Sequence, residues 1–145
     1  MLRQTKTPLC VIRRPPIGKI YYRFLVPIVD DELGEMACNY AVEVARAFTS
    51  TLFFVTVADA SATRAASDLL DRAKQCASVG GIKADGVILA QRQSVSQAIL
   101  DESNAQESDA IIMASHARDG YMRLVKGSVT EAVIRSSLLP VVVIR

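Results

Sequence analysis

Short apolar runs without a single charge alternate along this chain with segments that have helical spacing. The clearest runs are 24–29, 51–57, 110–114 and 141–144. Their apolarity is continuous rather than alternating, which is typical of parallel strands that are covered on both faces. Each run is of strand length, and none approaches the roughly 20 residues of a membrane-spanning helix. The pattern therefore predicts an α/β domain and no membrane association.

Four amphipathic segments separate these runs and predict helices. They cover residues 34–48, 61–78, 94–107 and 124–136. Residues 82–89 form a weaker strand, because Asp85-Gly86 interrupts it, and this suits a sheet edge or a bulge better than a sheet centre. Strands that alternate with helices require right-handed crossovers and a parallel sheet. We expect an open five-stranded parallel sheet in the order 3-2-1-4-5, with helices on both faces.

In sheets of this kind a ligand binds beyond the carboxyl ends of the strands, where the strand order reverses. Near the predicted start of the last helix lie Gly127, Ser128 and Thr130. Unpaired N–H groups, two hydroxyls and the helix dipole would converge there and favour an anion. The sequence predicts an anion site at this position, and a helix cap without ligand is the alternative.

Several motifs resemble, in order and spacing, the universal stress protein (UspA-type) family over residues 23–145. They are Val26-Pro-Ile-Val-Asp30, Asp109-Ala-Ile-Ile-Met113, Gly127-Ser-Val-Thr130 and Leu139-Pro-Val-Val-Val-Ile144. The resemblance implies an adenine nucleotide alpha hydrolase-like fold. It also implies a homodimeric regulatory or binding module in stress response, which binds ATP or another adenine nucleotide with or without Mg²⁺. A nucleotide-free homodimeric interaction protein without a cofactor is the alternative.

Carried over position by position, the resemblance implies Asp30 beside the ribose, Val57 beside the adenine and a phosphate-binding loop. The nucleotide-binding residues implied are Pro27, Asp30, Val57, Met113, Ala114, Ala117, Gly127, Ser128, Val129 and Thr130. No catalytic or metal-binding residue is predicted, so any ATP hydrolysis is expected to be slow and incidental. A solvated acidic turn that favours the next helix is predicted for residues 30–32, with a divalent cation as the alternative.

The sequence departs from the family pattern within this set of residues. One extra residue separates Pro27 from Asp30, which predicts a displaced carboxylate. Ala114 and Ala117 stand where the family has glycine, and their methyl groups narrow the approach of a phosphate. These departures keep the nucleotide-free alternative open.

Residues 1–20 form a basic arm ahead of a domain at 21–145. Six of the 17 basic residues precede residue 24, where no acid occurs, and 11 basic residues face 15 acids in the remainder. The arm is expected either to be disordered or to add residues 9–12 as an edge strand. Because the remainder has no Lys/Arg cluster with interleaved aromatics, no nucleic-acid partner is expected. No targeting segment is recognised, so a cytoplasmic location is expected.

The last predicted strand, residues 141–144, is uncharged and strongly β-forming. At an open sheet edge its unpaired backbone groups would pair with a second copy, so we expect a homodimer through this strand. The three cysteines, Cys10, Cys38 and Cys76, are odd in number and far apart. They have no zinc or dithiol spacing, so reduced thiols are expected, with the last two packed as small apolar residues.

Overall fold

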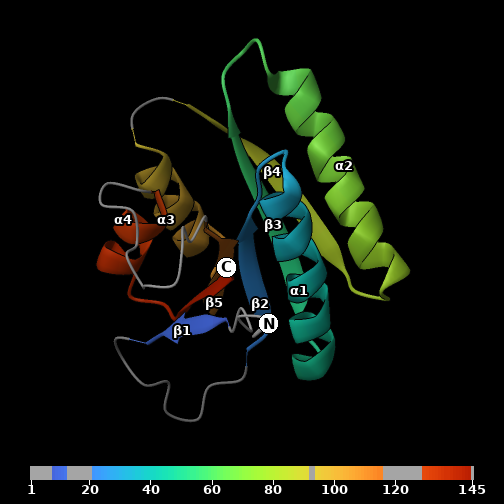
Figure 1. Cartoon of the computed structure of the whole chain (residues 1–145), viewed down its shortest axis with the longest axis vertical. Coiled ribbons are helices and arrows are strands. Elements are labelled where there is room, and N and C mark those ends of the chain that lie inside the picture. Colours follow the sequence, from blue (N-terminus) through green and yellow to red (C-terminus); the bar gives the residue numbers. More distant parts are fainter. Residues whose placement is uncertain (1–7, 13–20, 92–93, 116–128, 145) are drawn as a thin grey trace, which may run out of the picture.

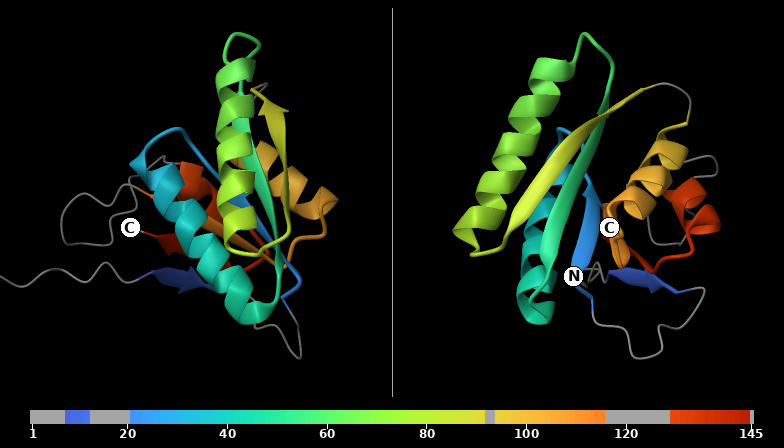
Figure 2. Two further views of the ribbon diagram at one scale, coloured as in Figure 1. Left: turned by 90° about the vertical axis from the view of Figure 1, so that its right-hand side faces the viewer. Right: turned by 180° about the vertical axis from the view of Figure 1, so that it is seen from behind.

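The computed structural model describes residues 8–12, 21–91, 94–115 and 129–144. They form a three-layer arrangement with a central sheet (Figure 1; Figure 2). Helices α1 (Glu32–Phe48) and α2 (Thr63–Val79) cover one face of the sheet. Helices α3 (Val95–Ala105) and α4 (Val129–Ser136) cover the other face.

Within the described residues the sheet has six strands, in the order β1-β6-β5-β2-β3-β4. They are β1 (Leu9–Val11), β2 (Arg23–Pro27), β3 (Thr51–Ala58), β4 (Ala84–Ala90), β5 (Ala110–Ala114) and β6 (Val141–Ile144). All neighbours from β6 to β4 are parallel. These five strands reproduce the predicted order 3-2-1-4-5, so the predicted fold class is confirmed, and the interrupted strand β4 lies at an edge as predicted. The sixth strand, β1, is the difference from the predicted count of five.

Strand β1 closes the edge that we expected to be open. It pairs antiparallel with β6, with Leu9 opposite Val143 and Val11 opposite Val141. The prediction of an open C-terminal edge is therefore wrong, because β6 has a strand on each side. The physical reason is the one that motivated the prediction: unpaired backbone groups attract a strand. The strand that pairs with them comes from the same chain.

The core is divided between the two faces of the sheet. Successive strand residues point to opposite faces, so β2 contributes Phe24 and Val26 to the side of α1 and α2, and Leu25 to the side of α3 and α4. Leu25 and Val26 are both completely buried. Continuous apolarity in the sequence thus corresponds to a strand that is covered on both faces.

The turn after β2 sets the start of α1. Asp31 caps the helix, because its carboxylate accepts a hydrogen bond from the Gly34 N–H at 3.0 Å. The helix therefore begins at Glu32, two residues before the predicted start. Gly34 packs so closely on this turn that a Cβ there would lie 1.9 Å from the Val29 carbonyl oxygen. The capped helix and this close contact hold the loop at the carboxyl end of β2.

No helix in the described part of the chain combines the length and apolarity needed to cross a membrane.

Candidate functional site

A cavity of about 370 Å³ opens at the carboxyl ends of the central strands. We call it the crevice cavity. It lies beyond the end of β2, which has β3 on one side and β5 on the other. From β2 the chain continues through β3 and β4 toward one edge of the sheet, and β5 and β6 then lie on the opposite side of β2. Open α/β sheets bind their ligands at this point of reversal. The topology alone therefore marks this cavity as the candidate site.

Six of the residues predicted for nucleotide binding lie together on the wall of the crevice cavity. Strands β2, β3 and β5 supply residues at or next to their carboxyl ends, and α4 supplies its first two residues. The six are Pro27, Val57, Met113, Ala114, Val129 and Thr130. Three others, Ala117, Gly127 and Ser128, lie outside the described residues.

The described wall of the crevice cavity is mostly apolar and carries no charged side chain. Its polar side chains are Thr56, Thr130 and Gln91, and both threonines are buried, at 6% exposure each. Small-molecule sites typically combine apolar walls with a few polar groups that fix the orientation. The first residues of α4 bring the positive end of a helix to the rim. Such a wall suits a flat, largely apolar group that carries an anion at one end.

Asp30 does not reach the crevice cavity. It lies on a second cavity, between α1 and α2, where its Oδ1 is 2.8 Å from Nη2 of Arg72. Both side chains are 63% exposed. The carboxylate also holds the pKa of the Arg72 guanidinium above its ordinary value, through a hydrogen bond and its charge. The residue that the resemblance implies beside the ribose thus lies outside the crevice cavity. The extra residue after Pro27 lets Asp31 cap α1 and leaves Asp30 facing the helices.

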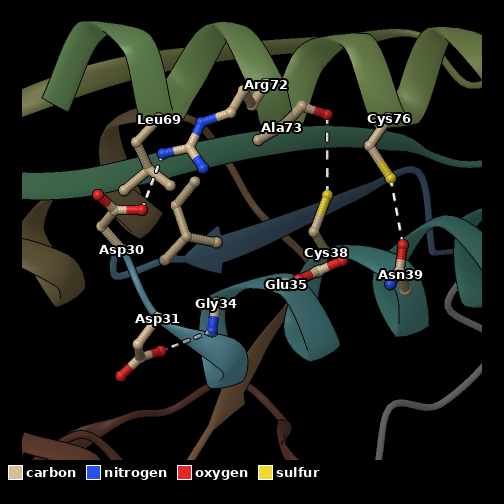
Figure 3. A pocket seen from close by; sticks show the side chains of 11 residues that line it. Asp30, Asp31, Gly34, Glu35, Cys38, Asn39, Leu69, Arg72, Ala73 and Cys76 are labelled. Carbon is tan, nitrogen blue, oxygen red and sulfur yellow. Dashed lines mark hydrogen bonds and ion pairs between the residues drawn. The ribbon is translucent and has the colours of Figure 1, made fainter. Parts of the chain in front are cut away.

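The second cavity, which we call the helix cavity, also has a volume of about 370 Å³. In Figure 3 Asp30, Asp31 and Arg72 lie toward one end of this cavity, and Glu35 lies beside Cys38. In this turn Asp31 serves as the helix cap and Asp30 as an ion-pair partner. Within the described ranges no group of three or more His, Cys, Asp or Glu side chains could hold a metal ion. Asp31 thereby supports the helix start, as the sequence predicted for this turn.

Several wall residues of the crevice cavity were not predicted. They include Leu33, Gly34, Thr56, Gln91, Val95 and Ile99. A signal existed for Thr56, which is a polar residue within an apolar strand run. Gln91 directly follows β4, at the same edge of the sheet as the other strand ends. The helix residues gave no signal, because which side of a helix meets a cavity depends on packing.

Comparison with known proteins agrees with this geometry. A universal stress protein of Methanocaldococcus jannaschii is 21% identical, over 87% of this chain and 83% of that protein. The crystal structure of a universal stress protein from Archaeoglobus fulgidus has a TM-score of 0.77 and 24% identity, covering 97% of this chain and 50% of that one. This chain therefore spans half the length of that protein.

Another universal stress protein structure from Archaeoglobus fulgidus is a complex with dAMP. It has a TM-score of 0.72 and 19% identity, over 88% of this chain and all of that one. These structural likenesses establish the shared fold. The model of the universal stress protein family matches residues 21–145. Because that match spans most of the sequence, this chain belongs to the universal stress protein family.

Proposed function

We propose that this chain is a regulatory binding module in stress response that holds an adenine nucleotide in the crevice cavity. The observation that carries the proposal is a mostly apolar cavity at the reversal point of the sheet, with the start of α4 at its rim. Family membership and the dAMP complex of an Archaeoglobus relative support it. A volume of about 370 Å³ is near the lower end for ligand pockets, which favours a mononucleotide.

The described residues suggest how such a nucleotide would lie. The base would pack on apolar side chains such as Val57 of β3 and Ile99 of α3, which both line the cavity. The phosphate would lie toward Val129 and Thr130, at the positive end of α4. Because Asp30 is turned away, the Thr56 hydroxyl or the Gln91 amide would have to hold the ribose.

Binding rather than catalysis is the proposed role. The described wall of the crevice cavity has no His, Asp, Glu, Lys or Arg side chain, so these residues supply contacts and no general base. Any ATP turnover is expected to be slow and incidental.

Isothermal calorimetry with AMP and ATP tests this function. Ala114→Leu fills the cavity at the end of β5 and should weaken binding by at least about tenfold, since several apolar atoms would occupy the space of the ligand. The matched control is Ala90→Leu, at the exposed end of β4 and away from the cavity. If the folded native chain binds neither nucleotide at millimolar concentration, the nucleotide-free alternative is correct. Mass spectrometry of the protein as purified would identify a ligand that stays bound.

A homodimer is proposed separately, with a changed interface. Strand β1 is now the outermost strand beside β6, and its residues Leu9-Cys10-Val11 carry no charge. Edge strands without charges invite pairing with a second copy. Light scattering should give twice the 15.7 kDa mass of the chain, and Cys10→Lys should return it to the monomer. A monomeric native chain at micromolar concentration contradicts the dimer without bearing on the nucleotide.

A further inference from the structure

Two of the three cysteines meet on the wall of the helix cavity. Cys38 lies on α1 and Cys76 on α2, and both line the cavity. Each thiol extends toward the opposite helix (Figure 3). The Cys38 Sγ lies 3.8 Å from the Ala73 carbonyl oxygen, and the Cys76 Sγ lies 3.4 Å from Oδ1 of Asn39. Cys76 is also close enough to help raise the pKa of the Cys38 thiol. Packing of the two helices has therefore produced a dithiol that the sequence spacing did not reveal.

The two thiols differ in access. Cys38 is only 6% exposed, whereas Cys76 is half-buried. Burial, with further contributions from the neighbouring Cys76 and Glu35, raises the pKa of Cys38 to about 12. Cys38 therefore stays protonated near neutral pH. Cys76 is the thiol more accessible to a solute in the helix cavity, and the thiolate is the form that reacts.

We propose that Cys38 and Cys76 are a peroxide-sensitive pair that forms a reversible disulfide between α1 and α2. The Cys76 thiolate attacks one oxygen of hydrogen peroxide, the O–O bond breaks, and the released hydroxide takes up a proton as water. The Cys76 sulfenic acid that results is then attacked by the Cys38 sulfur. The S–O bond breaks, and the leaving hydroxide takes the Cys38 proton. Two thiols and one peroxide thus give one disulfide and two waters.

The last proton transfer explains how a thiol with a high pKa takes part. Cys38 is not the initial nucleophile, so it needs no free thiolate before the sulfenic acid forms. Its proton leaves with the hydroxide that its own attack displaces. The two roles follow from the positions of the thiols. The accessible thiol reacts with the oxidant, and the buried thiol converts the resulting sulfenic acid to a disulfide before it is oxidised further.

The disulfide would fasten the two helices that cover one face of the sheet. It would close a long loop of chain that contains most of α1, β3 and most of α2. Cross-linking such a loop restricts the unfolded chain, so the oxidised protein should melt several degrees higher, roughly 5–10 °C for a domain of this size.

Peptide mapping of the full chain tests the pair directly. The reduced protein is treated with hydrogen peroxide, quenched with catalase, denatured in iodoacetamide and digested for mass spectrometry. The expected product is a peptide pair joined through Cys38 and Cys76, lost after treatment with dithiothreitol. Exposed Cys10 serves as an internal comparison, because it has access to peroxide without a resolving partner within the described chain. Full alkylation of Cys38 and Cys76 in a sample whose Cys10 is oxidised would overturn the proposal.

Single variants separate the two roles. Cys10→Ser should leave the cross-link unchanged. Cys38→Ala should leave Cys76 as a sulfenic acid that dimedone traps, while Cys76→Ala should leave Cys38 unmodified because it is buried. Circular dichroism checks that each variant folds, and the map of the native chain stands without them. Dimedone labelling of Cys38 in folded Cys76→Ala, as fast as that of Cys76 in Cys38→Ala, would contradict the proposed order of reaction.

Discussion

The crevice cavity and the helix cavity have the same volume, about 370 Å³, and share Ile28 and Gly34 on their walls. Their chemistry is opposite. The described wall of the crevice cavity is uncharged and is formed largely by strand ends, whereas the helix cavity carries four charged side chains and two thiols from the region of α1 and α2. Volume alone thus says little about the ligand. Sheet topology determines the crevice cavity, and individual residues on two helices determine the other.

A substitution in the wall that the two cavities share should have the largest effect. In Gly34→Ala the added Cβ would lie 1.9 Å from the Val29 carbonyl oxygen, so the turn between the cavities must shift. Moving backbone in a packed region is costly, and we expect a loss of about 3 kcal/mol in the free energy of unfolding. Urea unfolding measures it.

Gly81→Ala is the control for this prediction. Gly81 has a positive φ of 73° but no atom within 4 Å of an added Cβ, so the cost is conformational alone, about 1 kcal/mol. Equal losses in the two variants would show that the close contact at Gly34 does not constrain the shared wall.

The next prediction is for the helix cavity and concerns how the free energy of unfolding depends on pH. Since the pKa of Cys38 is raised to about 12, the folded chain keeps this proton to a higher pH than the unfolded chain does. The stabilisation is complete below the unfolded pKa, about 9, and is lost as pH rises toward 12. The free energy of unfolding under reducing conditions should therefore fall by about 1 kcal/mol per pH unit above 9. Cys38→Ala should flatten this slope, and an unchanged slope would assign it to other groups.

Removing a single hydroxyl from the wall of the crevice cavity should change its affinity for AMP. Thr56→Val keeps the shape of the wall and removes one polar group, so AMP affinity should fall by up to about tenfold. Thr51→Val is the matched control, because Thr51 lies at the opposite end of β3. Its hydroxyl donates a hydrogen bond to the Tyr22 carbonyl oxygen there. Calorimetry compares the two. Equal AMP affinities would mean that Thr56 makes no contact with the nucleotide.

Much of the architecture could be predicted because the signals are local. Continuous apolar runs indicated buried parallel strands, and the helical spacing of the intervening segments indicated helices on both faces. Together they predicted a parallel sheet with helices on both faces, and the strand order that we expected for such a sheet is the one in the structure. The same order predicted a crevice at the strand ends, and it is there that Pro27, Val57 and Ala114 lie together.

The remaining features depend on distances that no local pattern encodes. Strand β1 pairs with β6 although nearly the whole domain separates them in sequence. Asp31 caps the start of α1, and the neighbouring Asp30 forms an ion pair with Arg72.

The sequence by itself determined the type and order of the elements, since periodicity is a property of neighbouring residues. Tertiary structure decided which strand covers the C-terminal edge, which cavity receives Asp30, and that Cys38 meets Cys76. These outcomes depend on how each helix is rotated against its neighbour and on the path of each loop. A change of one residue in a turn, or of part of a turn in a helix, redirects a side chain without altering the pattern that predicts the element.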